Sequence, residues 1–196
     1  MKYVDAEIAN LKKEILKLHE IAKKAVELCF RAIRDKSIVK EISRLEEMSD
    51  ELEARIHDSC SQFIIRFHPM AKDMRFAVGM MRISSAYERI VDLAQEISLY
   101  ECNLRDTILS AEKPLLAMFD VVKRGFDHQA DLRNEMIALD DAVDEIYIKV
   151  LEEIEKDFRC VEEVLAARHI ERIGDLLCKI ATRLIYIHSG KWTWIK

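Results

Sequence analysis

The chain has 196 residues, half of them apolar, with 4 Gly, 2 Pro and a formal net charge of −5. So few turn residues favour long helices joined by short connections, and the acidic balance argues against non-specific nucleic-acid binding, which needs a basic surface. The apolar runs fall short of the roughly 20 residues of a membrane span, and the first residues lack a signal-peptide core, so we expect a cytoplasmic protein without direct membrane insertion.

Apolar residues in the first half recur at alternating steps of four and three, which is the spacing of a helical seam. Asp35 and Ser37 offer side chains that cap a helix. Pro69 ends the second helix, because the residue before a proline is pushed out of α geometry. We predict helices over residues 4–34, 37–67 and 70–102.

The second half repeats this plan. Pro114 is expected to break or kink the start of its first helix, and Gly190 is expected to stop its last. The predicted helices span residues 106–127, 131–157 and 161–189. Short connections make neighbouring helices antiparallel, so the predicted fold is all-α: six long antiparallel helices in two tandem three-helix bundles, residues 1–102 and 103–196.

Two motifs recur between the halves. Tyr87-Glu-Arg-Ile-Val-Asp-Leu93 returns 83 positions later as Ile170-Glu-Arg-Ile-Gly-Asp-Leu176. The segment that begins Leu45-Glu-Glu-Met-Ser-Asp returns 94 positions later as Leu139-Asp-Asp-Ala-Val-Asp. The offsets differ by 11 residues, which indicates a shorter second-to-third-helix hairpin in the second unit, with both motifs near the base of the hairpin.

Each unit therefore carries one acid-x-x-x-acid pair on its second helix and another on its third: Glu46/Asp50 with Glu88/Asp92, and Asp140/Asp144 with Glu171/Asp175. Residues four apart share a helix face, where like charges repel, and a hard cation would compensate. Oxygen ligands favour Mg, Ca, Mn or oxidised iron over zinc, although the identity of the ion, zinc included, stays open. Alternatively, these are ordinary solvated acids that pair with Arg89 and Arg172.

The heptad phase indicates where the acids point. It places Glu46 and Asp140 at position e, Asp92 and Asp175 at f, and the others (Asp50, Asp144, Glu88 and Glu171) at b. None is at a core position, so a metal site would lie on an outer face. A carboxylate-bridged metal enzyme buries its ligands and adds Glu-x-x-His, which this sequence lacks. Motifs for covalent catalysis or nucleotide hydrolysis are also missing, so we expect no enzyme.

The cysteines and tryptophans complete the pattern. The five cysteines include no C-x-x-C pair, and we interpret them as small buried hydrophobes in a reducing compartment, without a disulfide framework. His57 and His169 are candidates for supplementary metal ligands. Trp192 and Trp194, in the tail after the last helix, are expected to dock onto the bundle or onto a second subunit.

Several stretches resemble the PhoU family of phosphate-uptake regulators: Pro69-Met-Ala-Lys-Asp-Met-Arg75, the two Glu-Arg-Ile-x-Asp-Leu motifs and Leu184-Ile-Tyr-Ile-His-Ser-Gly190. The resemblance implies a cytoplasmic negative regulator of phosphate uptake and homeostasis that binds the ATPase of a phosphate ABC transporter and a sensor kinase, and that forms homodimers. It also implies metal ions, in some members iron clusters, on the eight acids. The second unit lacks the proline turn of the first. Adaptors of another transporter or ion channel, and a carboxylate-metal bundle enzyme, are the alternatives.

Overall fold

The computed structural model describes residues 2–127 and 132–195, and these ranges contain helices and no strand. The long helices are α1 (Lys2–Ala32), α2 (Val39–Phe67), α3 (Lys72–Leu99), α5 (Glu112–Asp127), α6 (Leu132–Lys156) and α7 (Val161–Ser189). Two short elements, η1 (Lys36–Ile38) and α4 (Asp106–Leu109), lie in connections. The all-α prediction with six long helices is confirmed. The expected start of the fifth helix, at residue 131, lies outside the described residues.

The helix ends follow the local sequence signals. Asp35 accepts a hydrogen bond from the Ser37 N–H at 3.0 Å, but it caps the single turn of η1 and not α2 itself. His68, with φ 44°, ends α2 directly before Pro69, and Gly190, with φ 71°, ends α7 as expected. The helix expected over 106–127 is interrupted between α4 and α5, and Pro114 lies in the first turn of α5, where a missing N–H is harmless.

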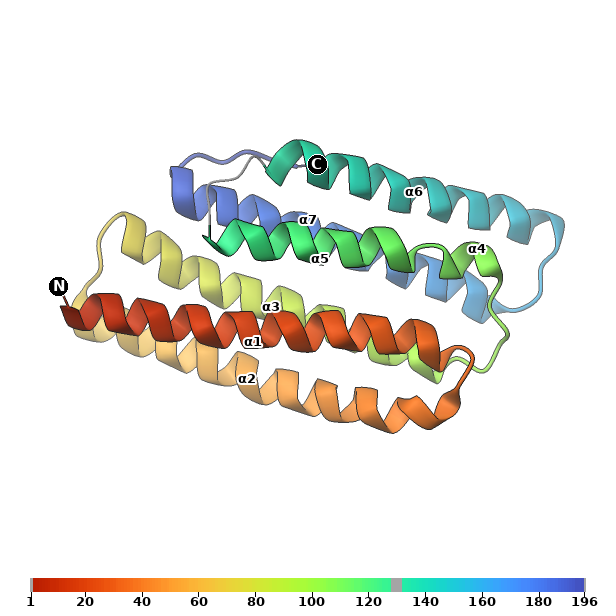
Figure 1. The fold of residues 1–196 in the computed structure, drawn as a ribbon, viewed down its shortest axis with the longest axis horizontal. Helices are drawn as coiled ribbons and strands as arrows, with labels where there is room; N and C mark the ends of the chain where they lie inside the picture. Colours follow the sequence, from red (N-terminus) through yellow and green to blue (C-terminus); the bar gives the residue numbers. More distant parts are fainter. Residues whose placement is uncertain (1, 128–131, 196) are drawn as a thin grey trace.

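The six long helices form two three-helix units that pack across α3 and α7 (Figure 1). α3 and α7 run antiparallel beside each other, with α2 and α6 on either side, while α1 and α5 cover this layer. The two units are thus related by an approximate twofold axis between α3 and α7. The boundary expected between residues 102 and 103 would fall in the connection from α3 to α4, and the division into 1–102 and 103–196 stays a prediction.

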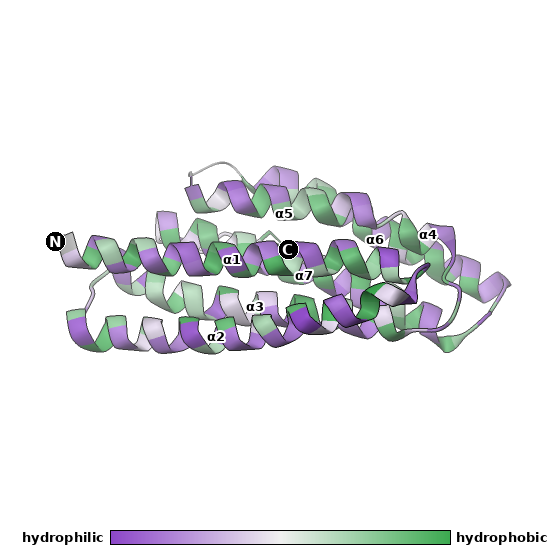
Figure 2. Cartoon of the chain, turned by 60° about the horizontal axis from the view of Figure 1, so that its bottom comes forward, coloured by the Kyte–Doolittle hydropathy of each residue, from purple (hydrophilic) through white to green (hydrophobic). Residues whose placement is uncertain are grey.

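Each helix turns an apolar stripe inward, and hydrophilic and hydrophobic residues alternate around it accordingly (Figure 2). A buried histidine joins three helices in this core. His19 of α1 is fully buried, and its Nδ1 lies 2.8 Å from the Tyr87 hydroxyl of α3. The rings of Phe119 and Phe126, both on α5, meet it edge-on. Burial lowers the pKa of His19 to about 4, so the ring is neutral at pH 7.

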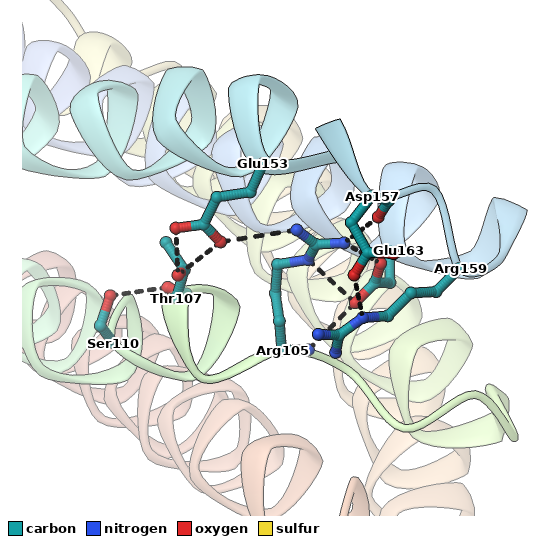
Figure 3. Close-up of polar contacts among 7 residues, drawn as sticks. All are labelled: Arg105, Thr107, Ser110, Glu153, Asp157, Arg159 and Glu163. Carbon is teal, nitrogen blue, oxygen red and sulfur yellow. Dashed lines mark hydrogen bonds and ion pairs between the residues drawn. The ribbon is translucent and has the colours of Figure 1, made fainter. Parts of the chain in front are cut away.

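A buried ion pair fixes the connection between the units to the start of α7 (Figure 3). Arg105 is 7% exposed and Glu163 is fully buried, and Arg105 Nη2 lies 2.6 Å from Glu163 Oε2. Glu163 Oε1 also accepts hydrogen bonds from the Arg105 Nε and backbone N–H. Arg105 donates to the Asp157 carbonyl oxygen as well, and Glu153 approaches within 3.6 Å. Since both charges are paired and hydrogen-bonded, their burial is tolerated.

The same end of the molecule holds a disulfide between Cys102 and Cys160, so the expectation of five free thiols is wrong for these two. Both lie in connections, after α3 and before α7, and not on the apolar seams. The antiparallel packing of the units brings their Cα atoms to 6.7 Å. Cys29, Cys60 and Cys178 are buried free thiols, as expected. With this disulfide present, the cysteines no longer argue that the protein resides in a reducing compartment.

Within residues 2–127 and 132–195, none of the helices combines the length and the apolar character that crossing a membrane requires.

The Glu163→Gln substitution should lower the free energy of unfolding by about 3 kcal/mol, because it leaves the buried Arg105 guanidinium with only the more distant Glu153, at 3.6 Å, as a countercharge. Urea denaturation followed by circular dichroism measures this change. The matched control is Glu135→Gln, because Glu135 pairs with Arg124 at 2.6 Å on the surface, where both side chains are half exposed. That change should cost less than about 1 kcal/mol, and equal losses in the two variants would contradict the role of burial.

Candidate metal centre

The acidic motifs lie on α2, α3, α6 and α7, the four helices of one layer. The two acids of each pair share a helix face because they are four residues apart. Asp50 is exposed and six of the other acids are partly exposed: Glu46, Glu88, Asp92, Asp144, Glu171 and Asp175. The predicted outer-face placement is therefore confirmed for seven of the eight. It is wrong for Asp140, which is only 2% exposed.

The first unit gathers its acids into a compact cluster across α2 and α3. One carboxylate oxygen each from Glu46, Asp50 and Asp92 lies within 4.8 Å of the others. Arg89 neutralises part of this charge, since its Nη1 lies 3.0 Å from Asp92 Oδ2. Three oxygens at this spacing are a donor set that a hard cation such as Mg²⁺, Mn²⁺, Ca²⁺ or iron would accept.

The electrostatics of the first set show that its negative charges are under-compensated. Partial burial and neighbouring carboxylates raise the pKa values of Glu46 and Asp50. Glu88 responds most: partial burial first, and then Asp92, raise its pKa to about 7. A bound cation would reverse this effect, because positive charge favours the ionised carboxylates. The residues present therefore fit a metal ion by charge as well as by donor type.

The second set does not converge in the same way: the acids of α6 and α7 form no comparable three-oxygen cluster within the described residues. Glu171 is drawn to Arg168 at 2.6 Å, so Arg168, and not Arg172, is its ion-pair partner. Its pKa is still raised, by partial burial and by Asp175. The two units thus present sets of the same residues with different geometry.

We attribute the burial of Asp140 to the small residue that faces it from α7. A Cβ built at Gly174 would lie at ordinary contact distance, 3.5 Å from Asp140 Oδ1 and 3.6 Å from Val143 Cγ1, so there is room for little more than a methyl group. At the equivalent position of the first unit is Val91, a larger residue that is fully buried on α3. The heptad phase alone could not distinguish these two cases, because it contains no inter-helix distance.

A polar cluster beside the first set was missed by the sequence reasoning. Ser85 Oγ donates to Glu53 Oε1 at 2.6 Å, and His57 Nε2 lies 3.0 Å from the Met81 carbonyl oxygen and 3.2 Å from Ser85 Oγ. Because a carbonyl only accepts, Nε2 carries the hydrogen and cannot take a proton from Ser85. The group therefore resembles a catalytic triad in composition only. The i, i+4 spacing of Glu53 and His57 was its one available signal.

The other candidate histidine is also engaged outside the acidic sets. His169 Nδ1 lies 3.1 Å from the Tyr100 hydroxyl, and its Nε2 lies 3.3 Å from Glu96 Oε2. These contacts link α7 to the end of α3. Neither His57 nor His169 belongs to the oxygen cluster of the first set.

Comparison with known proteins agrees with the duplicated architecture. The family model of the PhoU domain matches twice, over residues 15–100 and 113–184, once in each three-helix unit. The chain belongs to the PhoU family. The two PhoU matches confirm the tandem repeat inferred from the recurring Glu-Arg-Ile-x-Asp-Leu motifs.

Relatives of this PhoU-family chain span its full length. It is 51% identical over 196 residues, covering 100% of both chains, to the "Phosphate-specific transport system accessory protein PhoU homolog" of Archaeoglobus fulgidus. It is 24% identical to PhoU homolog 1 of Thermotoga maritima, covering 96% of this chain and 90% of that protein. Its fold matches crystal structures of PhoU from Pseudomonas aeruginosa (TM-score 0.85, 21% identity, 95% and 99% coverage) and Streptococcus pneumoniae (TM-score 0.82, 20% identity, 97% and 99% coverage).

The role of Gly174 can be tested by two substitutions at this position. Gly174→Ala should leave the free energy of unfolding unchanged or raise it by up to about 1 kcal/mol. The added Cβ would lie at ordinary contact distance from Asp140 and Val143, and alanine favours the helix more than glycine does. Gly174→Val copies Val91 and should cost about 1–3 kcal/mol by overpacking against α6. Urea denaturation measures both. If valine is tolerated as well as alanine, close helix approach is not what buries Asp140.

The raised pKa of Glu88 predicts a pH dependence in protein freed of metal by a chelator. Folded Glu88 titrates near 7 and its ordinary pKa is 4.5, so between these values the folded state binds more protons. The free energy of unfolding should therefore fall as pH rises from about 4.5 to 7, by about 1 kcal/mol after solvent screening. Glu88→Gln should remove this component, and Glu51→Gln, on the exposed side of α2, should retain it. Urea denaturation across this pH range decides, and identical pH profiles for the wild type and Glu88→Gln would contradict the assignment.

Proposed function

We propose that this chain is a non-enzymatic accessory protein that negatively regulates phosphate uptake and phosphate homeostasis by binding other proteins. The observation that carries this proposal is 51% identity, over the full length of both chains, to a relative named as a phosphate-specific transport accessory protein. Resemblance over part of a chain would support a shared fold, whereas identity at this level over both units supports a shared role.

The proposed role of metal rests on the acidic sets. Glu46, Asp50 and Asp92, with Glu88 beside them, would hold a cation on the outer face, where it would neutralise like charges and tie α2 to α3. Asp140, Asp144, Glu171 and Asp175 are the proposed second ligand set. Iron, Mg, Mn and Ca suit these oxygen donors best. Because the first set faces outward, the arrangement favours a structural or bridging metal over a buried catalytic one.

The proposed partners are the ATPase of a phosphate ABC transporter and a sensor kinase, both met in the cytoplasm, and the chain is proposed to act as a homodimer. This assignment follows from the family, whose relatives carry the name of a phosphate transport accessory protein. The enzyme alternative is not favoured by the geometry, since Ser85 lacks a base and the first acidic set lies on an outer face.

Replacement of the gene tests both parts of the proposal. Deletion should raise phosphate uptake under phosphate-rich growth, and the wild-type gene should restore the low rate. A second variant carries alanine at the four acids of α3 and α7: Glu88, Asp92, Glu171 and Asp175. Elemental analysis should show that this variant has lost its metal, and it should no longer repress phosphate uptake. The matched control places alanine at four exposed acids outside the sets: Asp5, Asp58, Glu101 and Glu152.

The two readouts separate the regulatory claim from the ligand assignment. Unchanged uptake in the deletion strain would overturn the regulatory role. A quadruple variant purified without chelator that keeps its metal would overturn the choice of ligands, whatever the phosphate phenotype.

A further inference from the structure

A groove crosses the boundary between the two units beside the first acidic set. It encloses about 710 Å³, and its apolar floor comes from α3 and α7: Val78, Met81, Ala86, Leu176 and Ile180. Ser85 and His57 border it on the α2 side. Ser85 and Glu88 lie three residues apart on α3, so the groove opens on the same face as the acids. Because α3 and α7 belong to different units, an occupant would contact both.

Three cations stand along this apolar floor: Arg82 on α3, and Lys179 and Arg183 on α7. None of them forms an ion pair with any of the residues that the structure describes. Partial burial, and then the like charge of Arg82, lower the pKa of Arg183. Glu53 of α2 lies behind the groove and accepts a hydrogen bond from Ser85. The residues that line the groove itself include these three cations and no acid.

The tail of the chain builds one end of the groove. Trp192 stacks on Tyr186 of α7 with ring centroids 4.4 Å apart, so the expected docking of the tail onto the bundle is confirmed for this residue. Arg183 lies over the Trp192 ring at 4.7 Å, which fixes the guanidinium in place. Trp194 stacks on Trp192 and lines the groove, yet it is 65% exposed. Exposed aromatic residues beside positioned cations are typical of protein interfaces.

We propose that this groove binds an acidic amphipathic helix of a partner protein, laid along α3 and α7. Such helices dock through apolar side chains at i, i+3, i+4 and i+7. The α3 wall runs from Val78 to Ala86, about 12 Å or two helical turns, which suits this spacing. Acidic side chains on the helix flanks would pair with Arg82 and Lys179. The inference rests on the proposed partner-binding function and specifies where, and by what chemistry, the partner is held.

A second copy of this chain is a less favourable occupant. The approximate twofold axis relates the groove to a second surface of the same chain. There Val161 and Leu165 are exposed, and Glu96 takes the position that Lys179 has in the groove. However, two copies joined through this whole face would bring their outward-facing acidic sets toward each other, and juxtaposed like charges oppose association. A single helix would contact only the groove lining, which holds three cations and no acid. A small anion would leave the apolar floor unused. A helix from a different, acidic protein satisfies both the floor and the cations.

The test uses a synthetic helical peptide of about 14 residues, with leucines at the stated spacing and glutamates on both flanks. Two matched peptides carry lysine for glutamate, or serine for leucine. Binding is measured by calorimetry and by the fluorescence of the chain's two tryptophans. The variant Arg82→Glu/Lys179→Glu should weaken binding of the acidic peptide at least about tenfold and should gain binding of the lysine peptide. Lys24→Glu, on the exposed side of α1, is the matched control and should change neither.

Several outcomes would overturn the proposal. They are failure of the acidic peptide to bind, equal binding by the serine peptide, or unchanged binding to Arg82→Glu/Lys179→Glu. If pyrophosphate displaced the acidic peptide, and the leucines of the peptide added nothing to its affinity, the groove would be an anion site. A dimer by sedimentation that dissociates only in this variant would indicate a second copy.

The same variant, placed in the deletion strain, should lose regulation of phosphate uptake while keeping its metal. The peptide measurements stand even if deletion leaves uptake unchanged, so failure of the groove and failure of the regulatory role can be distinguished. Full regulation by Arg82→Glu/Lys179→Glu would show that the groove is not the partner surface.

Discussion

The antiparallel contact between α3 and α7 is the interaction on which the rest of this structure depends. Each of these helices packs within its own unit and also against its counterpart, so the two halves share one continuous core. Because the helices run in opposite directions, the start of α3 meets the end of α7. The groove with its aromatic end lies at that place, and the Cys102–Cys160 bridge and the Arg105–Glu163 pair lie at the other. The twofold relation also places both acidic sets on one outer face.

Much of the fold follows from sequence periodicity, because a seam of buried residues both defines a helix and fixes the face it buries. The limits of α7, residues 161–189, coincide with the prediction, and α2 ends at the predicted Phe67. The interruption between α4 and α5 was anticipated only as a break or kink near Pro114. Its position depends on the packing of the short α4 turn against α6 and α7, which a one-dimensional pattern does not contain.

The candidate site was predictable in part for the same reason. Spacing identifies which acids share a helix face, but whether they converge depends on the distance between helices. The two units differ at this point, with Val91 in one and Gly174 facing Asp140 in the other, and one set gathers three oxygens while the other buries Asp140. The cysteine pairing and the contacts of Ser85 were beyond the sequence for a similar reason, since both join segments that only the tertiary packing brings together.

The Cys102–Cys160 bridge also changes the covalent topology of the polypeptide. With a sequence separation of 58, it closes α4, α5 and α6 into a covalent ring, from which the first unit and α7 extend as two arms. A single backbone cut within that ring would yield two fragments that remain covalently joined by the disulfide until a thiol reductant is added. The continuity of the oxidised protein therefore does not depend on every peptide bond of its second unit.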